Sequence, residues 1–89
     1  MEKNIVYIAD RPGRFEICAA LVRHKNTVAT EIFKRVYIIR AEHFYAENVF
    51  RYVGFSLLFE RVLEGAKIPQ YKFIYDSISK TITAERVDD

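Results

Sequence analysis

The feature of the sequence that most constrains its fold is a long apolar segment, residues 44–64. Its hydrophobic residues recur at three- and four-residue steps, which is typical of a helix packed on a core. Gly65 follows at the position where such a helix would end. Aromatic residues also lie beside the main stripe: Phe44, Tyr45, Tyr52, Phe55 and Phe59. The segment therefore predicts a long helix that is apolar around most of its circumference, with a second face to bury.

Shorter segments predict the other elements. Residues 4–9, 36–39, 71–75 and 81–87 are rich in β-branched and aromatic residues, which favours strands. The last two are joined by residues 76–80, which are typical of a hairpin turn. From Phe15 onward, helical spacing predicts a first helix. It either ends near Asn26 or continues to about Arg35, and the pattern leaves both possibilities open.

These elements follow one another in the order β-α-β-α-β-β, and no linker or repeat divides the 89 residues. We therefore expect residues 1–89 to form a single α+β domain, with a small mixed sheet packed by two helices. A domain of this size gains from a partner subunit, and the second apolar face of residues 44–64 indicates where that subunit would bind. We expect a homodimer, or a contact with another protein partner, through Tyr45, Tyr52, Phe55 and Phe59.

Composition restricts the chemistry. The single cysteine, Cys18, excludes an intramolecular disulfide and a thiolate metal cluster, and no signal peptide or membrane-spanning run is found. We expect a cytoplasmic protein without a membrane partner. His24 and His43 have no partner at a catalytic or metal-binding spacing, and residues 11–14 lack the pattern of a phosphate-binding loop. We expect no catalytic residues, no metal site and no cofactor.

Several pieces of the chain carry a family resemblance. They are residues 5–8 leading into Arg11 and Pro12, the Ala-Ala-Leu of residues 19–21, and residues 36–40 followed by residues 46–49. Together with the order of elements, they resemble the Alba family of small archaeal chromatin and RNA-binding proteins. The resemblance implies a dimer that lies along a duplex and contacts phosphates through basic residues. It also implies that the terminal hairpins reach into a groove.

Carried over by position, Arg11 stands where the family has a lysine before its proline, Arg40 lies near the end of the second strand, and Lys80 lies near the hairpin tip. Arg14 and His43 complete the predicted nucleic-acid-binding set. Asp10 stands where a second basic residue is usual, and residues 41–44 replace an Arg-Gly-rich turn. We therefore expect a small, non-catalytic nucleic-acid-binding protein that acts as a homodimer and binds weakly, which agrees with a net charge of only +2.

A first alternative is a protein-interaction or inhibitor module. It rests on the aromatic residues of the predicted long helix and on the nearly neutral charge. Tyr37, Tyr45, Phe55 and Phe59 would form the contact, because aromatic side chains dominate the energetics of protein interfaces. Binding to another protein, with an affinity that does not change with salt concentration, would favour this function.

A second alternative follows if residues 15–23 and 27–40 are strands. Asp10, Glu47 and Asp76 then lie at element ends, an arrangement similar to that of the ribonuclease H-like nucleases. Carboxylates that converge there would hold two divalent ions for phosphodiester hydrolysis. The helical spacing of residues 15–22 argues against this parse.

Overall fold

The computed structural model describes residues 9–24 and 27–87, within which five strands and two short helices form. In chain order these are β1 (Pro12–Cys18), α1 (Ala19–Arg23), α2 (Thr27–Arg35), β2 (Tyr37–Phe44), β3 (Val49–Phe55), β4 (Gln70–Asp76) and β5 (Thr81–Val87). The predicted strand at residues 4–9 lies outside the described part, apart from Ala9, which belongs to a turn. No helix in the described part is long and apolar enough to cross a membrane.

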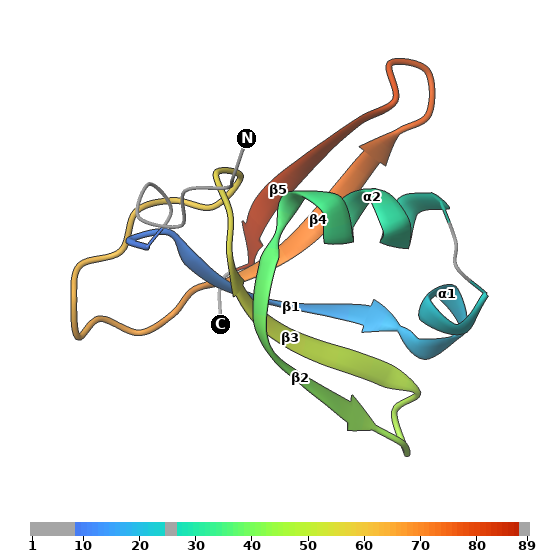
Figure 1. The fold of residues 1–89 in the computed structure, drawn as a ribbon, viewed down its shortest axis with the longest axis horizontal. Helices are drawn as coiled ribbons and strands as arrows, with labels where there is room; N and C mark the ends of the chain where they lie inside the picture. Colours follow the sequence, from blue (N-terminus) through green and yellow to red (C-terminus); the bar gives the residue numbers. More distant parts are fainter. Residues whose placement is uncertain (1–8, 25–26, 88–89) are drawn as a thin grey trace.

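The five strands form one mixed sheet in the order β2-β3-β1-β4-β5 (Figure 1). The central strand, β1, is antiparallel to β3 along its whole length. It is parallel to β4 over only two residue pairs, Arg14 with Gln70 and Phe15 with Tyr71. Beyond these pairs the β4–β5 hairpin turns away from β1, so the sheet opens into two wings (Figure 1).

The expectation of a small single α+β domain with a mixed sheet and two helices is confirmed, but the order of elements is wrong. The observed order is β-α-α-β-β-β-β, not β-α-β-α-β-β. The strand predicted at residues 36–39 falls at the start of the longer β2, and the predicted terminal hairpin is β4–β5. The first helix does not begin at Phe15, because residues 15–18 are the second half of β1.

The long helix predicted at residues 44–64 is also wrong. This segment contains the end of β2, a turn at residues 45–48, the whole of β3 and the start of an irregular loop. In β3, Tyr52 and Gly54 are buried while Val53 between them and Phe55 after them are half-buried, which is the alternation of a strand. The residues on both faces of β3 are mostly apolar, so this alternation is hidden in the sequence.

The core lies between the sheet and the two helices. Phe15 and Ile17 of β1 pack there with Tyr52 of β3 and with Ala29 and Ile32 of α2. The remaining buried members of this cluster are Val36, Phe59, Tyr71 and Ile82. The side chains that alternate with these inward residues point to the other face of the sheet. Neither α1 nor α2 covers that face (Figure 1).

The loop at residues 56–69 is fastened to the sheet by specific polar contacts. The hydroxyl of Ser56, which is only 1% exposed, donates to the carbonyl oxygen of Arg35 at 2.7 Å. Arg11 donates from Nη1 to the carbonyl oxygen of Phe59 at 2.7 Å, and the backbone N–H of Glu60 donates to the Tyr71 hydroxyl at 2.8 Å. These contacts hold the Phe59 ring against Tyr71, with 4.5 Å between the ring centroids.

Candidate functional site

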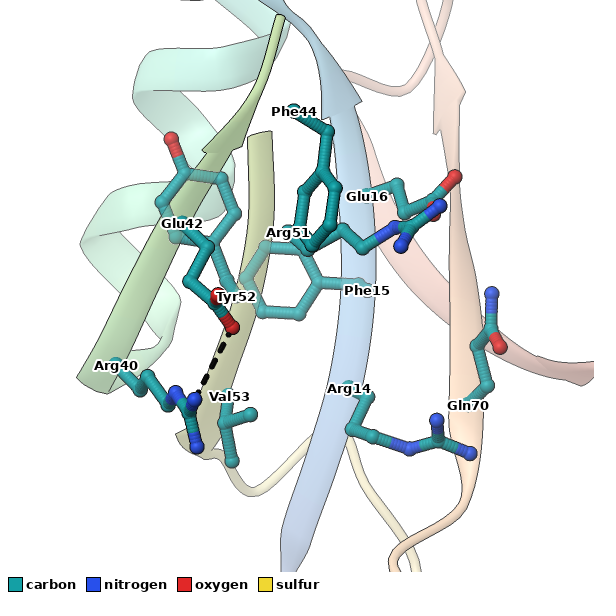
Figure 2. Close-up of a pocket in the computed structure, with 10 residues that line it drawn as sticks. All are labelled: Arg14, Phe15, Glu16, Arg40, Glu42, Phe44, Arg51, Tyr52, Val53 and Gln70. Atoms are coloured by element: carbon teal, nitrogen blue, oxygen red, sulfur yellow. Dashed lines mark hydrogen bonds and ion pairs between the residues drawn. The ribbon is translucent and has the colours of Figure 1, made fainter. Parts of the chain in front are cut away.

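The uncovered face of the sheet carries most of its charged side chains in two rows that run across the strands. The register places Arg40 of β2 and Arg14 of β1 on either side of Val53 of β3, and Gln70 of β4 next to Arg14. We call these four residues the cationic row. Figure 2 shows them side by side on four neighbouring strands. Two guanidinium groups, an apolar floor and an amide therefore share one line across the sheet.

The second row lies two residues along the strands. Glu42 of β2, Arg51 of β3 and Glu16 of β1 are paired directly across the sheet, and we call them the ion-pair row. Arg51 donates to Glu16, and also from Nη2 to Glu47 at 2.7 Å. The hydrogen bond with Glu16 raises the pKa of the Arg51 guanidinium above its ordinary value. Arg51 therefore stays charged, and its charge is offset locally by carboxylates.

An aromatic ring completes this region. The guanidinium carbon of Arg51 lies 4.0 Å from the centroid of the Phe44 ring, a cation–π contact. The two rows and Phe44 line an open hollow of about 440 Å³ (Figure 2). The hollow offers charged, amide and flat π surfaces together.

The cations of the hollow are held by neighbours. Arg40 forms an ion pair with Glu42 at 3.3 Å, with both side chains at least half exposed. Arg14 donates from Nε to the carbonyl oxygen of Ile68 at 3.0 Å, which ties β1 to the loop before β4. An exposed ion pair such as that of Arg40 with Glu42 is weak in water. A stronger anionic ligand can therefore compete for Arg40, while Arg14 is held in position by the backbone.

The structure brings together two of the five residues predicted to bind nucleic acid, Arg14 and Arg40. Arg11 does not line the hollow and donates a hydrogen bond to the carbonyl oxygen of Phe59. His43 lies on the opposite side of β2, stacked on Phe50 and Tyr45 with ring centroids 4.4 and 5.0 Å apart. Lys80 lies in the β4–β5 turn, at the far end of that hairpin.

The four residues predicted to form a dimer interface do not share a surface. Tyr52 and Phe59 are buried in the core at 7% and 1% exposure, and Phe55 is half-buried. Tyr45 is 83% exposed, in the turn between β2 and β3. A helix over residues 44–64 would align these four side chains, whereas a strand followed by a loop separates them.

The three carboxylates of the nuclease alternative also lie apart. Asp10 precedes β1 and pairs with Arg61 at 3.4 Å, whereas Glu47 lies in the turn beside the other end of β1. Asp76 accepts hydrogen bonds from two backbone N–H groups of the β4–β5 turn. Within residues 9–24 and 27–87, no three potential metal-ligating side chains form a cluster.

Most of the hollow was missed because its residues were assigned to helices. Glu16 falls in the predicted first helix, Arg51 and Val53 fall in the predicted long helix, and Gln70 lies just before the strand predicted at residues 71–75. One signal was present in the sequence, the alternation of charged and apolar residues at residues 14–17. That alternation is the pattern of a strand with one face in the core.

Comparison of the chain with protein-family models, curated proteins and solved structures gives no match. Its function must therefore be inferred from its own residues.

Proposed function

We propose that this protein is a non-catalytic nucleic-acid-binding protein that holds a single strand on the open face of its sheet. The observation that carries this proposal is the cationic row. Arg40 and Arg14 stand two strands apart, which is about 10 Å at the usual strand spacing, with Val53 between them. Two guanidinium groups at this separation can each contact a phosphate of one extended strand. Arginine suits this role because its planar guanidinium group offers paired N–H donors to phosphate oxygens.

The rest of the hollow suits the bases. Proteins that bind single strands stack the bases on aromatic rings or on guanidinium planes, and read base edges with polar side chains. The guanidinium carbon of Arg51 lies 4.0 Å from the centroid of the Phe44 ring, so both kinds of surface are present in the hollow. The amide of Gln70, at the end of the cationic row, carries both a hydrogen-bond donor and an acceptor.

The acidic residues limit the affinity. Glu16 and Glu42 lie in the neighbouring row and repel phosphate, so only the two arginines of the cationic row are expected to release counterions. For single strands the logarithm of the affinity falls against the logarithm of the salt concentration by about 0.7 per phosphate contacted, which gives a slope of about −1.4. Binding is therefore weak and moderately dependent on salt.

The test is fluorescence anisotropy with labelled single-stranded DNA and RNA across a salt series. Arg14→Gln and Arg40→Gln should each reduce the slope to about −0.7, because each removes one phosphate contact. Arg86→Gln is the matched control, since Arg86 is an exposed arginine that pairs with Glu60 away from the hollow. Far-UV circular dichroism checks that the variants remain folded.

Three results would count against the proposal. One is the absence of binding at low salt, and another is equal loss of binding in Arg86→Gln and Arg40→Gln. Shortening of the oligonucleotide when magnesium is added would contradict the non-catalytic part.

A second candidate function is binding to another protein. It is favoured by Leu57 and Leu63 in the loop at residues 56–69, which are 69% and 85% exposed. Apolar side chains exposed on one loop can be buried by contact with a protein partner. This function would be favoured over the first if the chain binds another protein with an affinity that does not depend on salt, and if Leu57→Ser/Leu63→Ser abolishes that binding.

A further inference from the structure

β2 is the edge of the sheet, and six of its eight residues are exposed. Among residues 9–24 and 27–87 its only neighbour in the sheet is β3, so its other side presents backbone N–H and carbonyl groups that can pair with another strand. We propose that β2 pairs with β2 of a second copy of this chain. The two strands would run antiparallel about a two-fold axis at Ala41.

The charges of β2 select this register. When two copies meet about a two-fold axis with their open faces on the same side, the residue at the axis lies opposite itself. An axis at Arg40 opposes two arginines, and an axis at Glu42 opposes two glutamates. An axis at Ala41 instead places Arg40 opposite Glu42 of the partner subunit, and this pair occurs twice. Opposite charges directly across a strand pair stabilise it, and like charges destabilise it.

The apolar residues of β2 favour the same edge. Tyr37 and Ile39, near the start of β2, are 44% and 55% exposed, and Tyr45 just beyond its end is 83% exposed. Antiparallel pairing brings the start of one β2 beside the end of the other, so these side chains would be covered. The bulge of β2 lies between Ile38 and Arg40, outside the regular stretch that contains Ala41 and Glu42. β5, the other edge strand, has no large exposed apolar residue.

The arrangement joins two five-stranded sheets into one, with both hollows on the same side. This inference does not rest on the proposed function, because its tests measure the oligomeric state. A monomer that binds nucleic acid would overturn the β2 pairing and leave the proposed function standing. A dimer that binds no nucleic acid would do the reverse.

The first test is disulfide cross-linking in a Cys18→Ser background, because Cys18 is an exposed thiol. Ala41→Cys places two thiols directly opposite each other across the axis, at a Cβ separation near that of a disulfide. We expect a covalent dimer under mild oxidation. The matched control is Thr83→Cys, an exposed position in the middle of β5, which should stay monomeric on a non-reducing gel.

The second test exchanges the charges and measures the mass in solution by light scattering. The unmodified protein should have twice the mass of the chain, and Glu42→Arg should be monomeric because it opposes two arginines. Arg40→Glu/Glu42→Arg restores the opposite charges and should restore the dimer, with circular dichroism to confirm folding. The proposal is overturned if the unmodified protein is monomeric up to its solubility limit. It is also overturned if the exchange does not restore the dimer, or if Thr83→Cys cross-links in place of Ala41→Cys.

Discussion

The close approach of β1 to the loop at residues 56–69 gives a quantitative prediction. Gly13 lies directly under the Phe59 ring, and a Cβ atom at this position would stand 2.6 Å from two of the ring carbons. The ring cannot move freely, because Phe59 is 1% exposed and is stacked on Tyr71. Gly13→Ala therefore overpacks the core, which should reduce the free energy of unfolding by about 1–3 kcal/mol.

The same argument predicts how this loss is relieved. Phe59→Leu removes the outer ring atoms and leaves a side chain whose branches can rotate away from β1. In that background Gly13→Ala should cost about 1–2 kcal/mol less than in the unmodified protein, since contacting residues couple by about 0.5–3 kcal/mol. Leucine is preferred to alanine, because Phe→Ala costs about 3–5 kcal/mol and a domain of this size has little stability to lose.

The assay is equilibrium unfolding in urea followed by far-UV circular dichroism, because the chain has no tryptophan. The matched control is Gly54→Ala in β3, where an added Cβ would stand 2.6 Å from the carbonyl oxygen of Tyr37. That contact is with the backbone, so Phe59→Leu should not relieve it. If Gly13→Ala and Phe59→Leu are additive within about 0.5 kcal/mol, the ring is not what excludes a side chain at Gly13.

Three other predictions concern single residues. Ser56→Ala leaves the carbonyl of Arg35 without its buried donor and should cost about 1–3 kcal/mol in urea unfolding, whereas no loss would show that water replaces the hydroxyl. Hydrogen bonds from backbone N–H groups of the turn lower the pKa of Asp76 in the folded protein. The ionised Asp76 carboxylate therefore stabilises the fold fully above the unfolded-state pKa of about 3.9, and this stabilisation is lost as the pH falls through the lower pKa of the folded state. Asp76→Asn should flatten the acid side of a plot of Tm against pH, and an unchanged slope would contradict this. Lys80 has a left-handed backbone with φ of 57°, so Lys80→Gly should stabilise the fold by about 1 kcal/mol, seen as a higher Tm, and an unchanged or lower Tm would refute the strain.

The terminal hairpin could be predicted because its signals are local. Asp76 accepts hydrogen bonds from the N–H groups of Ile78 and Ser79 at 2.9 and 3.3 Å, which is the turn chemistry that its residue type indicates. The strands on either side alternate sufficiently for their type to be read. No distant part of the chain is needed to recognise this unit.

Residues 44–64 could not be predicted in the same way, because their apolar residues fit two periods at once. Val49, Val53 and Phe55 lie on the face of β3 that is not in the core, yet they are as apolar as Phe50 and Tyr52 on the other face. The turn before β3 contains neither glycine nor proline. Its one indication is Asn48, whose φ of 56° belongs to a region that asparagine tolerates better than most residues.

Only part of the candidate site could be predicted, because the site depends on how the strands pair in the sheet. Arg14 and Arg40 were named, but only the pairing of β2 with β3 and of β3 with β1 makes them neighbours. They are separated by 26 positions in the chain, and no local pattern reports such a register. Arg11 is a related case: its position before a proline predicts a phosphate contact, whereas its hydrogen bond to the carbonyl oxygen of Phe59 depends on a loop 48 positions away in the chain.

The near-neutral charge of the chain is compatible with an anion-binding surface because the register sorts the charges into rows. In the ion-pair row, Arg51 is offset by Glu16 and by Glu47 of the neighbouring turn, while Glu42 pairs with Arg40. The cationic row itself contains two arginines and no carboxylate. The rows stand two residues apart along the strands, about 6.6 Å, while the screening length at physiological salt is about 8 Å. The carboxylates are therefore only partly screened from a phosphate on the cationic row. This surface should therefore bind a single strand weakly.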